Sequence, residues 1–142
     1  MNMKRNGILA AAAVALIGGC ATISNVIPGE QVALSGANEV PPVATSASGS
    51  GTVHVKSDCT VTARITVTGM TATAAHIHEG KVGANGGVIV PFVKSGDNTF
   101  VAPEGAKMNE AQCSAYKAGN TYVNVHSEQY KPGEVRAQLK GR

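Results

Sequence analysis

Hydrophobic and polar residues alternate in short runs along most of the chain after residue 31. The clearest run is 60–68, whose apolar positions are Val61, Ala63, Ile65 and Val67. A period of two places alternate side chains in the core and in solvent, as in a half-buried β-strand. Shorter runs of the same kind predict strands at 32–34, 51–56, 74–78, 86–93, 98–102, 121–127 and 134–139.

One segment has a different pattern and predicts a short helical turn. Residues 109–117 begin at Asn109, a good N-cap, and are followed by Gly119, a common helix stop. Glycine and proline separate the predicted strands. We therefore expect an all-β domain, a Greek-key sandwich or flattened barrel of seven or eight short antiparallel strands with one short helical turn.

The first 31 residues predict an export signal and a tether. Lys4 and Arg5 precede a charge-free run, 7–19, which is shorter than the roughly 20 residues that cross a bilayer as a helix. The run ends at Ile17-Gly18-Gly19-Cys20, which resembles a bacterial lipobox. We expect a lipoprotein signal peptide at 1–19, a lipidated Cys20 with a tether to residue 31, and a β domain over 32–142. An ordinary signal cleaved near Ala21 is the alternative.

The lipoprotein pattern also predicts a location and a redox state. Ala21 does not resemble an inner-membrane retention signal, so we expect an anchor in outer-membrane lipid, facing the periplasm or the cell surface. Cys59 and Cys113 then remain as an even pair in an oxidising compartment, and we expect a disulfide. Two soft metal ligands are the alternative, but the CxxC spacing typical of such sites is missing.

Composition narrows the function classes. The chain has 142 residues, 43% hydrophobic but only 4% aromatic, which suits one core of small aliphatic side chains. The formal net charge is only +3, and the lysines and arginines do not cluster in any segment of the sequence. Nucleic acid is therefore not an expected partner. GxSxG, Walker A and strand-to-helix GxGxxG motifs are absent from the sequence, and we do not expect an enzyme.

The four histidines carry the candidate chemistry. His76 and His78 flank Ile77, so a strand that buries Ile77 directs both imidazoles to its outer face. At roughly 3.3 Å of rise per residue, the two side chains are spaced to share one metal ion. His126 and His54 have the same outward parity in their predicted strands. We expect an exposed patch of up to four histidines that binds copper or zinc.

Other side chains could support such a site. Glu79 directly follows His78, and Glu128 comes two residues after His126. Each glutamate could accept a hydrogen bond from an imidazole N–H. Met70 and Met108 are weaker candidates as soft ligands. The alternative is that the histidines are solvated surface residues and the glutamates ordinary surface charge.

Six segments together resemble one known module, the CHRD domain first described in chordin. They are 34–36, 39–43, 75–80, 83–88, 119–127 and 132–139, and the resemblance covers about residues 32–142. It implies an all-β, immunoglobulin-like barrel with no general catalytic activity. In chordin the domain belongs to an extracellular binder of growth factors.

A weaker similarity is to Cu/Zn superoxide dismutase, a Greek-key barrel whose copper site takes an HxH pair and a histidine from a late strand. It implies these roles for His76, His78 and His126. The dismutase's bridging histidine, zinc aspartate and late arginine have no match here, which argues against a full dismutase.

Three functions remain at this point. The first is a lipid-anchored metal-binding module for storage, buffering or delivery of copper or zinc. The second is a structural or adhesive envelope module, in which Tyr122, Asn124 and His126 form a polar outer face for a protein or glycan. The third is an enzyme that acts on superoxide at an open copper site.

Overall fold

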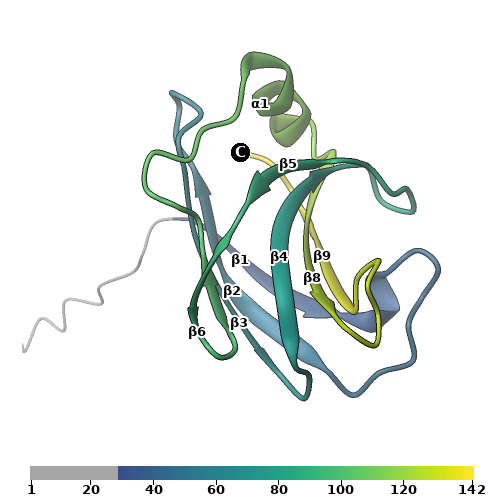
Figure 1. The fold of residues 1–142 in the computed structure, drawn as a ribbon. Coiled ribbons are helices and arrows are strands. Elements are labelled where there is room, and N and C mark those ends of the chain that lie inside the picture. Colours follow the sequence, from purple (N-terminus) through teal and green to yellow (C-terminus); the bar gives the residue numbers. More distant parts are fainter. Residues whose placement is uncertain (1–28) are drawn as a thin grey trace, which may run out of the picture.

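The computed structural model describes residues 29–142, which form nine strands, one α-helix and a 3-10 turn (Figure 1). The predicted signal peptide, Cys20 and most of the tether lie outside the described residues. The elements are β1 Glu30–Ser35, η1 Gly36–Asn38, β2 Ser48–Val55, β3 Val61–Thr68, β4 Ala72–Glu79, β5 Val88–Pro91, β6 Val93–Gly96, β7 Thr99–Val101, α1 Glu110–Lys117, β8 Thr121–Ser127 and β9 Val135–Leu139. None of the helices in this part of the chain has the length and apolar character needed to span a membrane.

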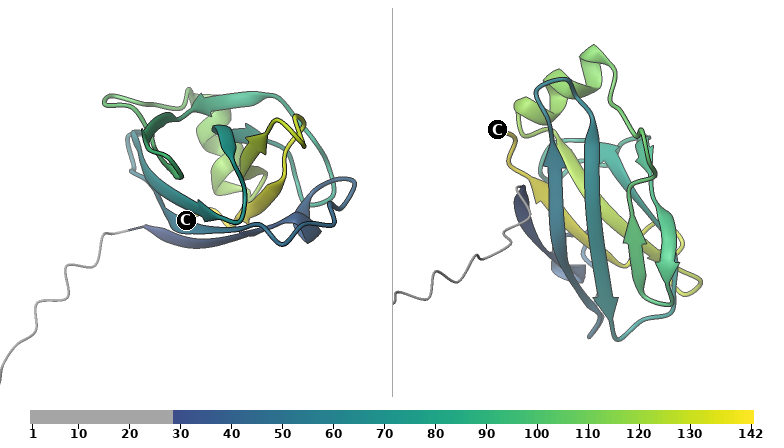
Figure 2. Two further views of the ribbon diagram at one scale, coloured as in Figure 1. Left: turned by 60° about the horizontal axis from the view of Figure 1, so that its bottom comes forward. Right: turned by 90° about the vertical axis from the view of Figure 1, so that its left-hand side faces the viewer.

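All nine strands belong to one antiparallel sheet, in the order β5-β4-β8-β9-β1-β2-β3-β7-β6. The sheet curls into a nearly closed barrel, and α1 lies across one end of it (Figure 2). The predicted all-β fold is confirmed. The structure has one strand more than the upper prediction, and the helix spans two turns rather than one.

The extra strand results from a break in the segment predicted as a single strand, 86–93. Pro91 ends β5 beside β4, and Val93 begins β6 beside β7, at the opposite edge of the sheet. Between them, the backbone N–H of Phe92 donates to the carbonyl of Ala75 at 3.0 Å. One continuous segment thus crosses the gap between the two edges, because proline lacks the N–H that would continue the ladder.

The core follows the predicted alternation. On β3, Val61, Ile65 and Val67 are buried while Thr62, Thr66 and Thr68 are exposed. The barrel interior is filled by aliphatic side chains with Phe100, as the aromatic-poor composition requires. Strand β8 departs from this pattern, because six of its seven residues are buried, on both faces of the sheet. Something other than solvent therefore covers its outer face.

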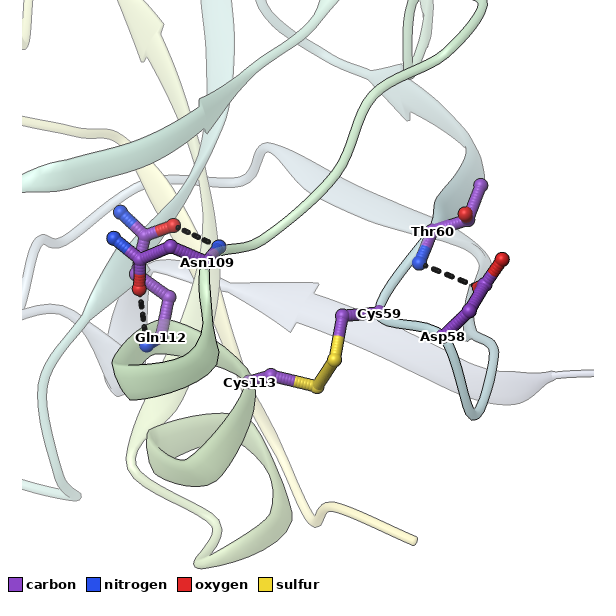
Figure 3. The surroundings of a disulfide bond; sticks show 6 residues. All are labelled: Asp58, Cys59, Thr60, Asn109, Gln112 and Cys113. Carbon is purple, nitrogen blue, oxygen red and sulfur yellow. Dashed lines mark hydrogen bonds between the residues drawn. A yellow bond between two sulfur atoms is a disulfide. The ribbon is translucent and has the colours of Figure 1, made fainter.

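The α1 end of the barrel is closed by a disulfide between Cys59 and Cys113, as predicted (Figure 3). It joins the β2–β3 turn to the helix, with the two Cα atoms 5.8 Å apart. Asn109 caps the helix in a reciprocal pair of hydrogen bonds with Gln112, each 2.9 Å long. The cap and the disulfide hold α1 over the core, where Tyr116 is buried.

Replacement of both cysteines by alanine should lower stability without changing the fold. The disulfide closes a loop with a sequence separation of 54, for which the chain-entropy model gives roughly 4 kcal/mol. Urea unfolding followed by circular dichroism measures this loss. The wild type unfolded in the presence of a reductant should have the same midpoint as the variant. A midpoint equal to that of the oxidised wild type would contradict the prediction.

Candidate metal centre

Three of the four histidines come together on the outer face of β4 and β8. These neighbouring strands pair so that Ala74 lies opposite His126 and His78 opposite Tyr122. The three rings, of His76, His78 and His126, have centroids 4.9 to 5.7 Å apart. One nitrogen from each ring lies within 4.8 Å of the others. This arrangement is compact enough to surround a single ion.

Backbone carbonyls orient two of the rings. The Nδ1 of His78 is 3.0 Å from the carbonyl oxygen of Gly86, and the Nδ1 of His126 is 2.8 Å from that of Lys131. A carbonyl can only accept, so each Nδ1 carries the proton and each neutral ring keeps its lone pair on Nε2. Metal-bound histidines are usually held in this way through the second nitrogen.

The third ring is linked to the second. The Nδ1 of His76 lies 3.0 Å from the Nε2 of His126, and it donates, since that Nε2 carries a lone pair. Two nitrogens bound to one ion at 2.0–2.1 Å lie about 2.9–3.4 Å apart for bond angles of about 90–109°. The observed separation is within this range. An ion at this distance from both nitrogens would lie to one side of the line that joins them and would displace the shared proton.

Burial keeps two of the imidazoles neutral. Burial, followed by the charges of His126 and His78, lowers the pKa of His76 from its usual 6.5 to about 4. Burial also lowers the pKa of His78; the bond to Gly86 opposes this shift, and His126 and Arg136 add to it. Protons therefore compete weakly for these two ligands at neutral pH.

The buried Nε2 of His78 has no hydrogen-bond partner among the described residues. Its residue is only 8% exposed. An unpaired polar atom in such a place is rare in folded proteins. A metal ion at the centre of the three rings would accept its lone pair and remove this cost. The residues present thus fit a bound metal.

The outer face that we expected to be exposed is covered in two ways: the loop between β4 and β5, residues 80–87, covers Tyr122, and Gly133 and Glu39 cover Asn124. Tyr122 and Asn124 are 3% and 2% exposed, which corrects the predicted polar, solvent-facing surface. Gly86 lies so close to β4 that a Cβ there would be 1.6 Å from the Glu79 carbonyl oxygen. Only glycine allows the loop to approach closely enough for its carbonyl to bind His78.

Arg136, on β9 opposite Asn124 of β8, lies near this site, although no sequence pattern predicted it there. Its guanidinium lies 3.4 Å from the Tyr122 ring centroid, and that ring stacks on His78 with centroids 4.9 Å apart. Its N–H groups donate to the loop carbonyls of Ala84 and Lys81 and to the Asn85 side chain. The alternation in 134–139 indicated that Arg136 points out of the barrel, but it did not indicate that a loop covers this side chain. The structure therefore adds a role for Arg136 that the sequence did not indicate: it bonds to the covering loop and stacks on the far side of the ring that contacts His78.

Several predicted contributors do not join the three histidines. His54 is on β2, opposite Thr62 of β3, and β1 and β9 separate it from β8. The prediction that His54 belongs to the same patch is therefore wrong. Glu79 is exposed, and Glu128 pairs instead with Lys131 at 3.9 Å. Backbone carbonyls take the expected place of these glutamates, and Met70 and Met108 pack in or against the core.

The metal-free protein should lose stability as the pH falls from 6.5 to about 4. Over this interval the unfolded chain binds protons at histidine that folded His76 does not, so the free energy of unfolding decreases. His76→Gln should flatten the dependence, whereas His54→Gln should retain it. Thermal unfolding in the presence of a chelator measures each slope. Equal slopes for His76→Gln and the wild type would contradict this prediction.

Comparison with known proteins identifies the family. The family model of the CHRD domain matches residues 31–139. No curated protein and no solved structure matches the chain, so the similarity to Cu/Zn superoxide dismutase stays a prediction. The match covers most of the chain, including both strands that carry the three histidines and the loop that covers them. The protein belongs to the CHRD domain family.

Proposed function

We propose that this CHRD-domain protein is a non-catalytic binding module that holds one copper or zinc ion through His76, His78 and His126. The observation that carries the proposal is the buried, unpartnered Nε2 of His78 beside two other imidazoles. Neutral imidazole is a good ligand for both metals. Hydrogen bonds to Gly86 and Lys131 hold two of the ligands ready before any ion arrives.

The half-exposed position of His76 and His126 bears on the kind of function. Three protein ligands leave an open coordination position, and structural zinc sites usually have four. An ion held in this way can exchange with solvent or with another carrier. We therefore favour storage, buffering or delivery over a purely structural role.

The proposal also includes export and a lipid anchor. The basic head, the charge-free run and the lipobox-like residues before Cys20 support it. The Cys59–Cys113 disulfide suits an oxidising compartment such as the periplasm. An anchor in outer-membrane lipid would keep the metal centre at the envelope surface.

A structural or adhesive role is the second candidate. Burial of Tyr122 and Asn124 removes the surface first expected for it, but a cleft of about 500 Å³ lies between the loops near Val40 and Val82. Its volume is within the range of ligand pockets. Under this candidate, a protein or glycan would bind in a way that a chelator does not affect.

Purified protein loaded with copper or zinc and then desalted should retain near one ion per chain. His126→Gln should lose the ion, and His54→Gln should retain it. Because the ion binds only the folded state, an excess of about 100 times its Kd should add about 2.7 kcal/mol to the free energy of unfolding. Metal analysis and thermal unfolding measure the two effects. Absence of retained metal in the folded wild type would refute the proposal.

Intact-mass analysis of protein extracted from membranes tests the anchor. The chain should begin at Cys20 and carry the mass of a diacylglyceryl group. Cys20→Ser should abolish this modification and release the protein into the soluble exported fraction. An unmodified chain that begins after Ala21 would contradict the prediction and favour ordinary signal cleavage.

A further inference from the structure

We infer that the metal centre selects the cuprous ion over divalent copper and zinc, and that an added anion strengthens the binding of a divalent ion there. This inference rests on the proposed function, since it concerns the ion held by His76, His78 and His126. It follows from the charges around the three rings rather than from the rings alone.

The ligands carry no negative charge. All three are imidazoles; neutral backbone carbonyls of Gly86 and Lys131 orient two of them, and the third bonds to His126. Zinc sites commonly orient their histidines with carboxylates, which offset part of the ion's charge. Here Glu79 is exposed, and Glu128 is exposed and paired with Lys131. Neither glutamate takes that part.

The nearest buried charges do not compensate for a cation. Arg136 stacks on Tyr122, which stacks on His78, so a guanidinium lies one aromatic ring behind a ligand. The buried carboxyl of Glu39 accepts a hydrogen bond from the Asn124 side chain and bonds to none of the three histidines.

These surroundings penalise a divalent ion more than a monovalent one. The cost of moving an ion out of water grows with the square of its charge, and repulsion from Arg136 grows in proportion to it. Cu(I) is also stable with three ligands, whereas Cu(II) and Zn(II) need at least one more donor. Water can supply this donor, but a small anion such as chloride or azide also offsets one unit of the ion's charge.

Competition titrations of the whole exported domain test the selectivity. Cu(I), kept reduced with ascorbate without oxygen, is titrated against bicinchoninate, and Cu(II) and Zn(II) against chromophoric chelators. We expect Cu(I) to bind at least about tenfold more tightly than either divalent ion. Retention of metal with tighter binding of Zn(II) or Cu(II) would overturn this inference and leave the proposed function intact. No binding of any ion would refute the proposed function itself.

A pair of variants tests the part played by charge. Arg136→Gln removes the guanidinium charge and keeps an amide donor for the loop, and we expect it to reduce the preference for Cu(I) over Cu(II) by about tenfold. Arg136→Lys keeps the charge and should retain the preference. An unchanged ratio in folded Arg136→Gln would overturn the explanation.

Azide provides a measurement that needs no variant, should Arg136→Gln fail to fold. Added azide should strengthen Cu(II) binding by the wild type and produce an azide-to-copper charge-transfer band, and it should leave Cu(I) affinity unchanged. Cu(II) binding that is indifferent to azide, with no such band, would overturn the inference.

Discussion

The pairing of β4 with β8 is the constraint on which the rest of this structure depends. It places Ile77 opposite Val123 on the core side, and His78 opposite Tyr122 on the other. Successive residues of a strand face opposite sides, so a slip of one residue would exchange the two sets. The apolar residues would then face outward and the imidazoles inward. The register that builds the core therefore also assembles the three histidines.

Two loops turn these histidines into an organised group: the covering loop holds His78, and the turn after β8 holds His126 through Lys131. Three side chains on an open sheet would rotate freely and titrate as in water. Beneath residues 80–87, His78 is fixed by a hydrogen bond to Gly86 and by stacking on Tyr122. Arg136 and Gln138 hold the loop by hydrogen bonds to its carbonyls, so side chains of the protein itself keep the cover in place. The entropy cost of fixing the His78 side chain is therefore largely met when the protein folds.

The sequence predicted the strands better than their surroundings. Period-two patterns located β3 and β8 within a residue, because alternation is a local property. Parity correctly grouped His76, His78 and His126, but it included His54, because parity does not reveal which strands are neighbours. It also placed Tyr122 and Asn124 in solvent, since the segments that cover them, the loop 80–87 over Tyr122 and Glu39 with Gly133 over Asn124, leave no periodic signal. The backbone carbonyls that orient the rings are present in every residue and cannot be recognised from sequence.

The segment that joins β5 to β6 has a consequence for how copies of this protein behave toward each other. An open sheet ends in rows of unpaired N–H and C=O groups that can recruit a strand from another molecule. Here both edges are strands of four residues, one of which ends in Pro91, and Lys94 reaches across to the Ala72 carbonyl. The sheet offers little template for strand addition. Two such barrels brought close together therefore have little tendency to join edge to edge into one continuous sheet.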